Sequence, residues 1–109
     1  MYLYFVGSSQ LCSFAAMIVH VILTDTHAHI YSEEFFEDAD LMMQRAFDAN
    51  VHRIFVPSID SSYTEKMWEM QQKYPENVFL MMGLHPTYVK ENYKEELDFV
   101  ANQLLEKKY

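Results

Sequence analysis

Cysteine is nearly absent from this chain: its 109 residues include one, Cys12. A lone cysteine cannot form an internal disulfide, so nothing indicates a secreted, disulfide-stapled module, and we expect a reducing, cytoplasmic location. Glycine and proline are also scarce, with two and three residues. Because half of the residues are apolar, a disordered or loop-rich chain is excluded.

Basic residues are outnumbered two to one, with 8 Lys and Arg against 16 Asp and Glu and a net charge of −8. This balance argues against a basic surface that binds nucleic acid and against binding to an anionic membrane surface, so no membrane partner is expected. The length allows at most one domain.

Charged residues are missing altogether from positions 1–24. The apolar run there is interrupted by Gly7 and several polar residues, so it falls short of the roughly 20 apolar residues of a spanning helix. A secretory signal is disfavoured because no positive start and no small-residue cleavage site is visible. We interpret residues 1–20 as an uncharged apolar extension, from a misplaced start or a weak signal-like segment. The folded part would begin near Met17, with the domain over residues 21–109.

From residue 21 onward, short apolar runs alternate with segments of helical period. Apolar runs at 21–25, 53–56 and 78–82 predict strands, and helices are expected over 39–49, from 62 to 74 and from 92 onward. The strands are nearly continuous in apolar residues, which is typical of parallel strands buried on both faces. Each unit is close to the roughly 30 residues of a (β/α)₈ barrel unit. We therefore predict an α/β fold, the first three βα units of a (β/α)₈ barrel, in preference to a small open sheet with apolar edges.

Local signals refine the helix ends. Asp38 is expected to cap the first helix, and Asn50 tolerates the left-handed conformation that ends helices. Ser62 and Glu65 have the spacing of a capping box. The last helix is predicted to turn inward a face made of Leu97, Val100, Ala101, Leu104 and Leu105.

Candidate chemistry gathers where the first strand ends, at Asp25-Thr26-His27-Ala28-His29. In extended backbone, residues two apart point the same way, so His27 and His29 can offer two imidazoles to one cation. Asp25 could accept an imidazole N–H and orient a ligand from outside. The alternative is two histidines that merely pack at a strand end.

A third histidine, His85, follows the last predicted strand and precedes Pro86, which puts it at the same edge of the sheet. Taken alone, it could equally be a loop residue that makes a local hydrogen bond. We interpret His52 and His20 as lying outside the site, and Asp60 as a turn former. No catalytic residue is identified from the pattern itself.

Five ordered motifs together resemble the N-terminal third of TatD-related metal-dependent hydrolases: residues 24–30, the acidic Phe-rich turn that follows them, and residues 56–61, 73–75 and 82–86. The resemblance implies a (β/α)₈ barrel of the amidohydrolase type that hydrolyses phosphodiesters, chiefly in DNA. It also implies one or two divalent metal ions, Mg, Mn or Zn, with His27 and His29 as ligands and His85 in the substrate site. DNA or another phosphodiester would be the partner, and no protein partner can be inferred.

The chain departs from the family in one large respect. The family's Glu-x-Gly-Leu-Asp stretch, two further histidine ligands and a late aspartate would lie beyond Tyr109. Two imidazoles are fewer than the three protein ligands of a typical catalytic site, so we expect the 109-residue chain alone to be inactive. Two alternatives stay open: another His-x-His phosphoesterase, of the polymerase-and-histidinol-phosphatase type, or a non-catalytic remnant.

Overall fold

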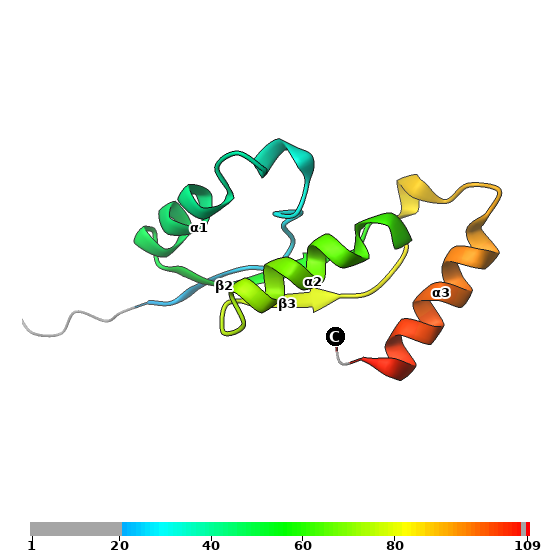
Figure 1. Ribbon diagram of the computed structural model, residues 1–109. Helices are drawn as coiled ribbons and strands as arrows, with labels where there is room; N and C mark the ends of the chain where they lie inside the picture. Colours follow the sequence, from blue (N-terminus) through cyan, green and yellow to red (C-terminus); the bar gives the residue numbers. More distant parts are fainter. Residues whose placement is uncertain (1–20, 108) are drawn as a thin grey trace, which may run out of the picture.

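The computed structural model describes residues 21–107 and residue 109. The interpretation of residues 1–20, with a folded part beginning near Met17, therefore lies outside the described residues. Within them, three strands alternate with three α-helices: β1 (Leu23–Asp25), α1 (Ala39–Asp48), β2 (Val51–Pro57), α2 (Thr64–Lys73), β3 (Val78–Met81) and α3 (Tyr93–Glu106) (Figure 1). This order confirms the predicted run of βα units.

The three strands form one sheet in the order β1-β2-β3, and both pairs are parallel. Asp25 lies opposite Ile54, and Pro57 lies opposite Met81. Because all strands run the same way, the loops that follow their carboxyl ends meet at one edge of the sheet. The loop after β1 and the loop after β3 are thereby brought to the same side of the molecule.

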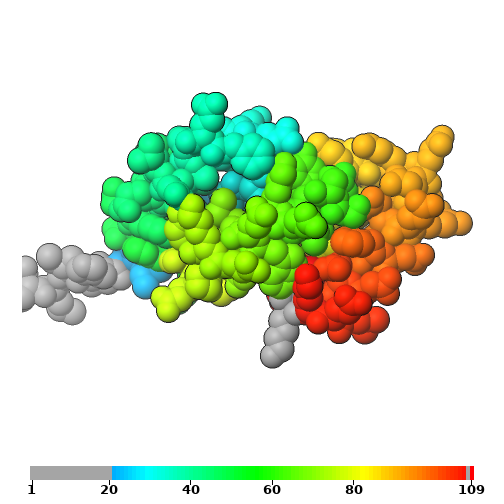
Figure 2. Space-filling model, viewed as in Figure 1, coloured from blue at the N-terminus to red at the C-terminus, as the bar shows by residue number. Residues whose placement is uncertain are grey.

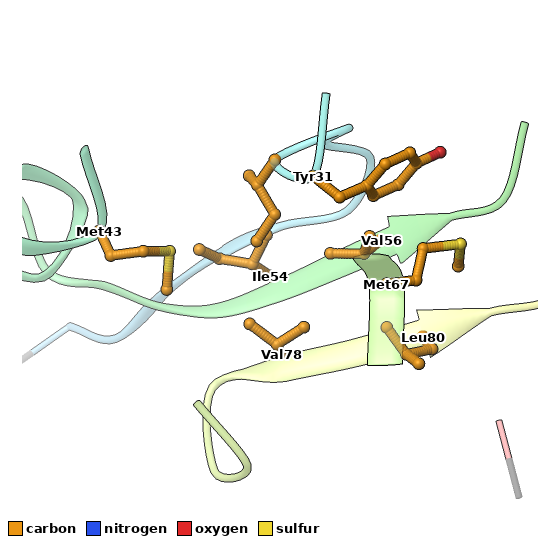
Figure 3. Close-up of a cluster of buried hydrophobic side chains, with 8 residues drawn as sticks. Tyr31, Met43, Ile54, Val56, Met67, Val78 and Leu80 are labelled. Carbon is orange, nitrogen blue, oxygen red and sulfur yellow. The ribbon is translucent and has the colours of Figure 1, made fainter. Parts of the chain in front are cut away.

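The core lies between one face of the sheet and the first two helices. Its members are fully or nearly buried side chains from the sheet, from α1 and α2 and from the loop after β1: Ile30, Tyr31, Met43, Ile54, Val56, Met67, Val78 and Leu80. Figure 3 shows Met67 beside Val56 and Leu80, and Met43 on the side of Ile54. Apolar burial of this kind is the main force that fixes the helices on the strands.

The opposite face of the sheet is open in the described part of the chain. Phe55 and Phe79 stack there with ring centroids 5.3 Å apart, and Phe79 keeps 39% of its surface exposed. Leu23 in β1 is 48% exposed. The prediction that the strands are buried on both faces is therefore wrong for this structure. The reason is that α1 and α2 cover one face only, so burial alternates along β3.

The helix ends follow the sequence in part. Asn50 adopts the left-handed conformation, with φ of 61°, as predicted. Asp38 does precede α1, but its carboxylate accepts a hydrogen bond from Arg45 at 2.9 Å instead of capping the helix. The capping box of Ser62 and Glu65 is wrong. Asp60 takes that role, accepting from the Ser62 backbone N–H at the start of a short 3₁₀ turn (Ser61–Tyr63) that precedes α2.

The predicted inward face of α3 is also wrong, except at Val100, which is partly buried. Leu97, Leu104 and Leu105 are 49%, 52% and 85% exposed, while the partly buried side is made of Glu96, Phe99, Val100 and Gln103. Glu96 explains the rotation, since its carboxylate accepts from the Ser61 backbone N–H at 2.9 Å and from the Ser61 hydroxyl at 3.0 Å. This polar attachment ties α3 to the 3₁₀ turn before α2. In Figure 2 the orange-to-red surface lies against the green one.

Candidate metal centre

Three histidines meet at the carboxyl edge of the sheet. His27 and His29 follow β1, and His85 follows β3. One ring nitrogen from each lies within 4.8 Å of the others. The ring centroids of His27 and His29 are 5.0 Å apart, and those of His29 and His85 are 5.9 Å apart. The parallel topology thus joins two sequence motifs separated by more than fifty residues.

The two histidines after β1 are the closest pair. The Nε2 atoms of His27 and His29 are 3.2 Å apart. Two nitrogens that each lie about 2.1 Å from one cation, at an angle of about 90–110°, are about 3.0–3.4 Å apart. The separation of this pair therefore fits two ligands of a single divalent cation.

The hydrogen bonds of His29 determine which of its nitrogens carries the proton. The hydroxyl of Tyr31 donates to the backbone carbonyl of Pro57 at 2.7 Å. A hydroxyl has one proton, so towards His29 Nδ1, 2.9 Å away, it must accept. The proton of a neutral His29 therefore sits on Nδ1, and the lone pair of Nε2 faces His27.

Burial favours the uncharged forms of both His29 and Tyr31. Desolvation lowers the pKa of His29, and positive charge on His27 or His85 would lower it further, against a smaller opposing effect of the Pro57 carbonyl. Burial, reinforced by the neighbouring Tyr63, raises the pKa of the Tyr31 phenol. A neutral imidazole is the form that binds metals.

His85 has the opposite arrangement. Its Nδ1 accepts from the backbone N–H of Thr87 at 3.3 Å and lies 2.8 Å from the Thr87 hydroxyl. A backbone N–H can only donate, so the proton of a neutral His85 sits on Nε2. The His85 backbone N–H also donates to the carbonyl of Ile59 at 2.8 Å, which ties its loop to the loop after β2. The Nε2 atom of a neutral His85 is thus a hydrogen-bond donor, whereas the Nε2 atom of a neutral His29 is an acceptor.

Asp25 lies at the end of β1, next to the pair. Its Oδ1 accepts from the backbone N–H of His27 at 3.0 Å. The carboxylate therefore orders the turn that presents His27 through the backbone, and its hydrogen bonds in the described part of the chain include none to an imidazole.

The other histidines and Asp60 lie apart from this cluster or serve the backbone. His52 stacks flat on Phe47 with centroids 5.6 Å apart, at the start of β2. His20 lies outside the described residues. Asp60 forms the turn before α2, as expected.

Two contributors to the site were not predicted from the sequence: Tyr31 and Thr87. Each stands two residues after a site histidine, His29 and His85 respectively. The same two-residue spacing that singled out His27 and His29 could have pointed to them. Neither residue type is a usual metal ligand, so the spacing carried no chemical signal by itself.

Comparison with known proteins decides the family. The family model described as TatD related DNase matches residues 24–109. The chain belongs to this family. The TatD family implies a TIM-barrel fold of the amidohydrolase type, and the three parallel strands with their helices agree with its first βα units.

Individual relatives of this TatD-family chain are described as metal-dependent hydrolases. An uncharacterized metal-dependent hydrolase of Haemophilus influenzae is 29% identical over 82 residues, which cover 73% of this chain and 31% of the relative. The uncharacterized metal-dependent hydrolase YabD of Bacillus subtilis is 29% identical over 79 residues, covering 72% of this chain and 31% of YabD. The matched part of this chain thus spans about a third of either relative's length. None of the helices in residues 21–107 is long and apolar enough to cross a membrane.

Proposed function

We propose that this chain carries the first metal ligands and a substrate contact of a metal-dependent hydrolase that cleaves phosphodiester bonds, with DNA as the substrate class. His27 and His29 hold one divalent cation, Mg, Mn or Zn, and His85 donates a hydrogen bond to a phosphoryl oxygen. Asp25 supports the turn that presents His27. The observation that carries this division is the hydrogen-bond geometry at Nδ1: His29 Nδ1 faces a hydroxyl that already donates to Pro57, whereas His85 Nδ1 accepts from the backbone N–H of Thr87.

A cation bound there supplies a water of lowered pKa and a Lewis acid for the phosphoryl group. The chain's own residues position that chemistry. The Nε2 atoms of His27 and His29 lie 3.2 Å apart at one strand end, where a cation would take the place of the hydrogen bond between them. Because Thr87 occupies its Nδ1, His85 would offer its Nε2–H to the phosphate. A second cation would need carboxylate ligands from elsewhere in the protein.

The acidic character of the chain fits this proposal if the metal supplies the positive charge. With a net charge of −8, the chain cannot bind many consecutive phosphates of a nucleic-acid backbone through basic side chains. A short contact centred on the scissile phosphate does not need such binding. Two imidazoles are below the three protein ligands of a typical catalytic site, so turnover requires further ligands and the isolated 109-residue chain is inactive.

Metal analysis of single variants tests the proposal. The chain and its variants are dialysed against Zn²⁺ or Mn²⁺, and bound metal is measured by elemental analysis. His27→Ala and His29→Ala should lose most of the bound metal, whereas His85→Ala and the matched control His52→Ala should retain it. In the full-length protein, His85→Ala should weaken hydrolysis of single-stranded DNA by about 2–4 kcal/mol, the usual cost of a lost transition-state donor.

The opposite pattern would overturn the proposal. Normal metal content in His27→Ala, or metal lost from His85→Ala but not from His52→Ala, contradicts the assignment of ligands. Metal-dependent cleavage of single-stranded DNA by the pure, monomeric 109-residue chain would contradict the ligand count.

A further inference from the structure

The side chain of Tyr31 is buried where the core meets the three histidines. It keeps 3% of its surface exposed, and Figure 3 shows its ring projecting from the loop after β1 above the end of β2. The hydroxyl takes part in two hydrogen bonds, with the Pro57 carbonyl at 2.7 Å and with His29 Nδ1 at 2.9 Å. The phenol therefore links the end of β2 to His29, one of the two histidines after β1.

The ring itself has little freedom to move. It packs against Tyr63 with centroids 5.4 Å apart, and it meets the edge of His29 at 5.7 Å with perpendicular planes. Tyr31 also belongs to the buried core, beside a cavity of about 160 Å³ that it helps to line. A hydroxyl held this rigidly imposes its hydrogen-bond polarity on its partner, because Pro57 can only accept.

We propose that Tyr31 is the positioning residue of the metal centre, which fixes His29 in the Nδ1–H form so that its Nε2 lone pair shares one cation with His27. This inference rests on the proposed function, since it assigns Tyr31 a role through a ligand of that site. The carbonyl, the hydroxyl and the imidazole form a chain in which each proton position is determined by the previous group.

The alternative form of His29 shows why the hydroxyl matters. With its proton on Nε2, His29 would direct an N–H at the point it shares with His27, and cation binding would first require the proton to move. A phenylalanine at position 31 keeps the ring and its packing but loses the acceptor. His29 would then lose the hydroxyl that favours a proton on Nδ1, and the weaker effect of the Pro57 carbonyl would remain.

Nitrogen NMR of histidine-labelled protein tests this directly, without metal. At a pH where the imidazoles are neutral, the wild-type Nδ1 of His29 should show the signature of a protonated nitrogen and Nε2 that of an unprotonated one. Tyr31→Phe should weaken this preference measurably. The matched control is Tyr63→Phe, which removes a neighbouring hydroxyl that has no hydrogen bond to a histidine among those of the described residues. Zn²⁺ affinity, measured by calorimetry, should fall about 10- to 100-fold in Tyr31→Phe and stay near wild type in Tyr63→Phe.

Each result decides the matter. A wild-type His29 with its proton on Nε2 overturns the proposal even if Tyr31→Phe fails to fold. Unchanged nitrogen shifts and Zn²⁺ affinity in Tyr31→Phe, or equal losses in Tyr63→Phe, also overturn it. Failure of the proposed function looks different: His27→Ala and His29→Ala would bind Zn²⁺ like wild type, whereas the NMR result on Tyr31→Phe would stand.

Discussion

Truncation of Met67 should show how much of the chain's stability comes from the covered face of the sheet. Met67 in α2 is 1% exposed and contacts the core formed by β2 and β3. Met67→Ala deletes three heavy atoms, which at about 0.8 kcal/mol per buried methylene amount to about 2.4 kcal/mol. The cavity left behind raises the expected loss to about 3–4 kcal/mol, within the usual range for such changes.

Met81→Ala is the matched control, because Met81 is the same residue type on the open face. It is 36% exposed, so its truncation should cost about 1 kcal/mol or less. Urea unfolding, followed by the fluorescence of the single tryptophan, Trp68, gives both values. Equal losses in the two variants would refute the reasoning, since they would mean that the open face carries as much packing as the covered one.

Two further predictions concern the parts that hold the helices in place. Glu96→Ala should release α3, since Glu96 accepts two hydrogen bonds from Ser61. Hydrogen exchange of the α3 amides should become faster by the equivalent of about 1–3 kcal/mol, while the amides of β2 stay protected. Unchanged exchange in α3 would contradict the attachment. Asn50→Ala should lower the free energy of unfolding by about 1–2 kcal/mol, because alanine disfavours φ of 61°. Asn50→Gly should unfold at the same urea concentration as wild type or higher, because glycine adopts positive φ readily. Equal destabilisation by both variants would show that the side chain matters and the backbone conformation does not.

Periodicity and composition were sufficient for the order of elements. The apolar runs at 21–25 and 78–82 contain β1 and β3, the run at 53–56 lies inside the longer β2, and the left-handed Asn50 was predicted from its residue type. These features depend on neighbours within a few residues, so the sequence determines them locally.

The sequence also placed the three histidines at one edge, because parallel strands always present their carboxyl ends together. It indicated His27 and His29 as a pair by their two-residue spacing. It could not show that their Nε2 atoms lie 3.2 Å apart, since that distance depends on side-chain rotamers, and the ring of His29 is held by Tyr31.

What only the tertiary structure decided involves partners far apart in the chain. The inward side of α3 follows from Glu96 reaching Ser61, 35 residues away, and not from the helix's own apolar stripe. The protonated nitrogen of His29 depends on a hydroxyl anchored to the Pro57 carbonyl, 26 residues from Tyr31. Local pattern determines which segments form strands and helices, but a face or a proton position is chosen by groups that meet only after the chain has folded.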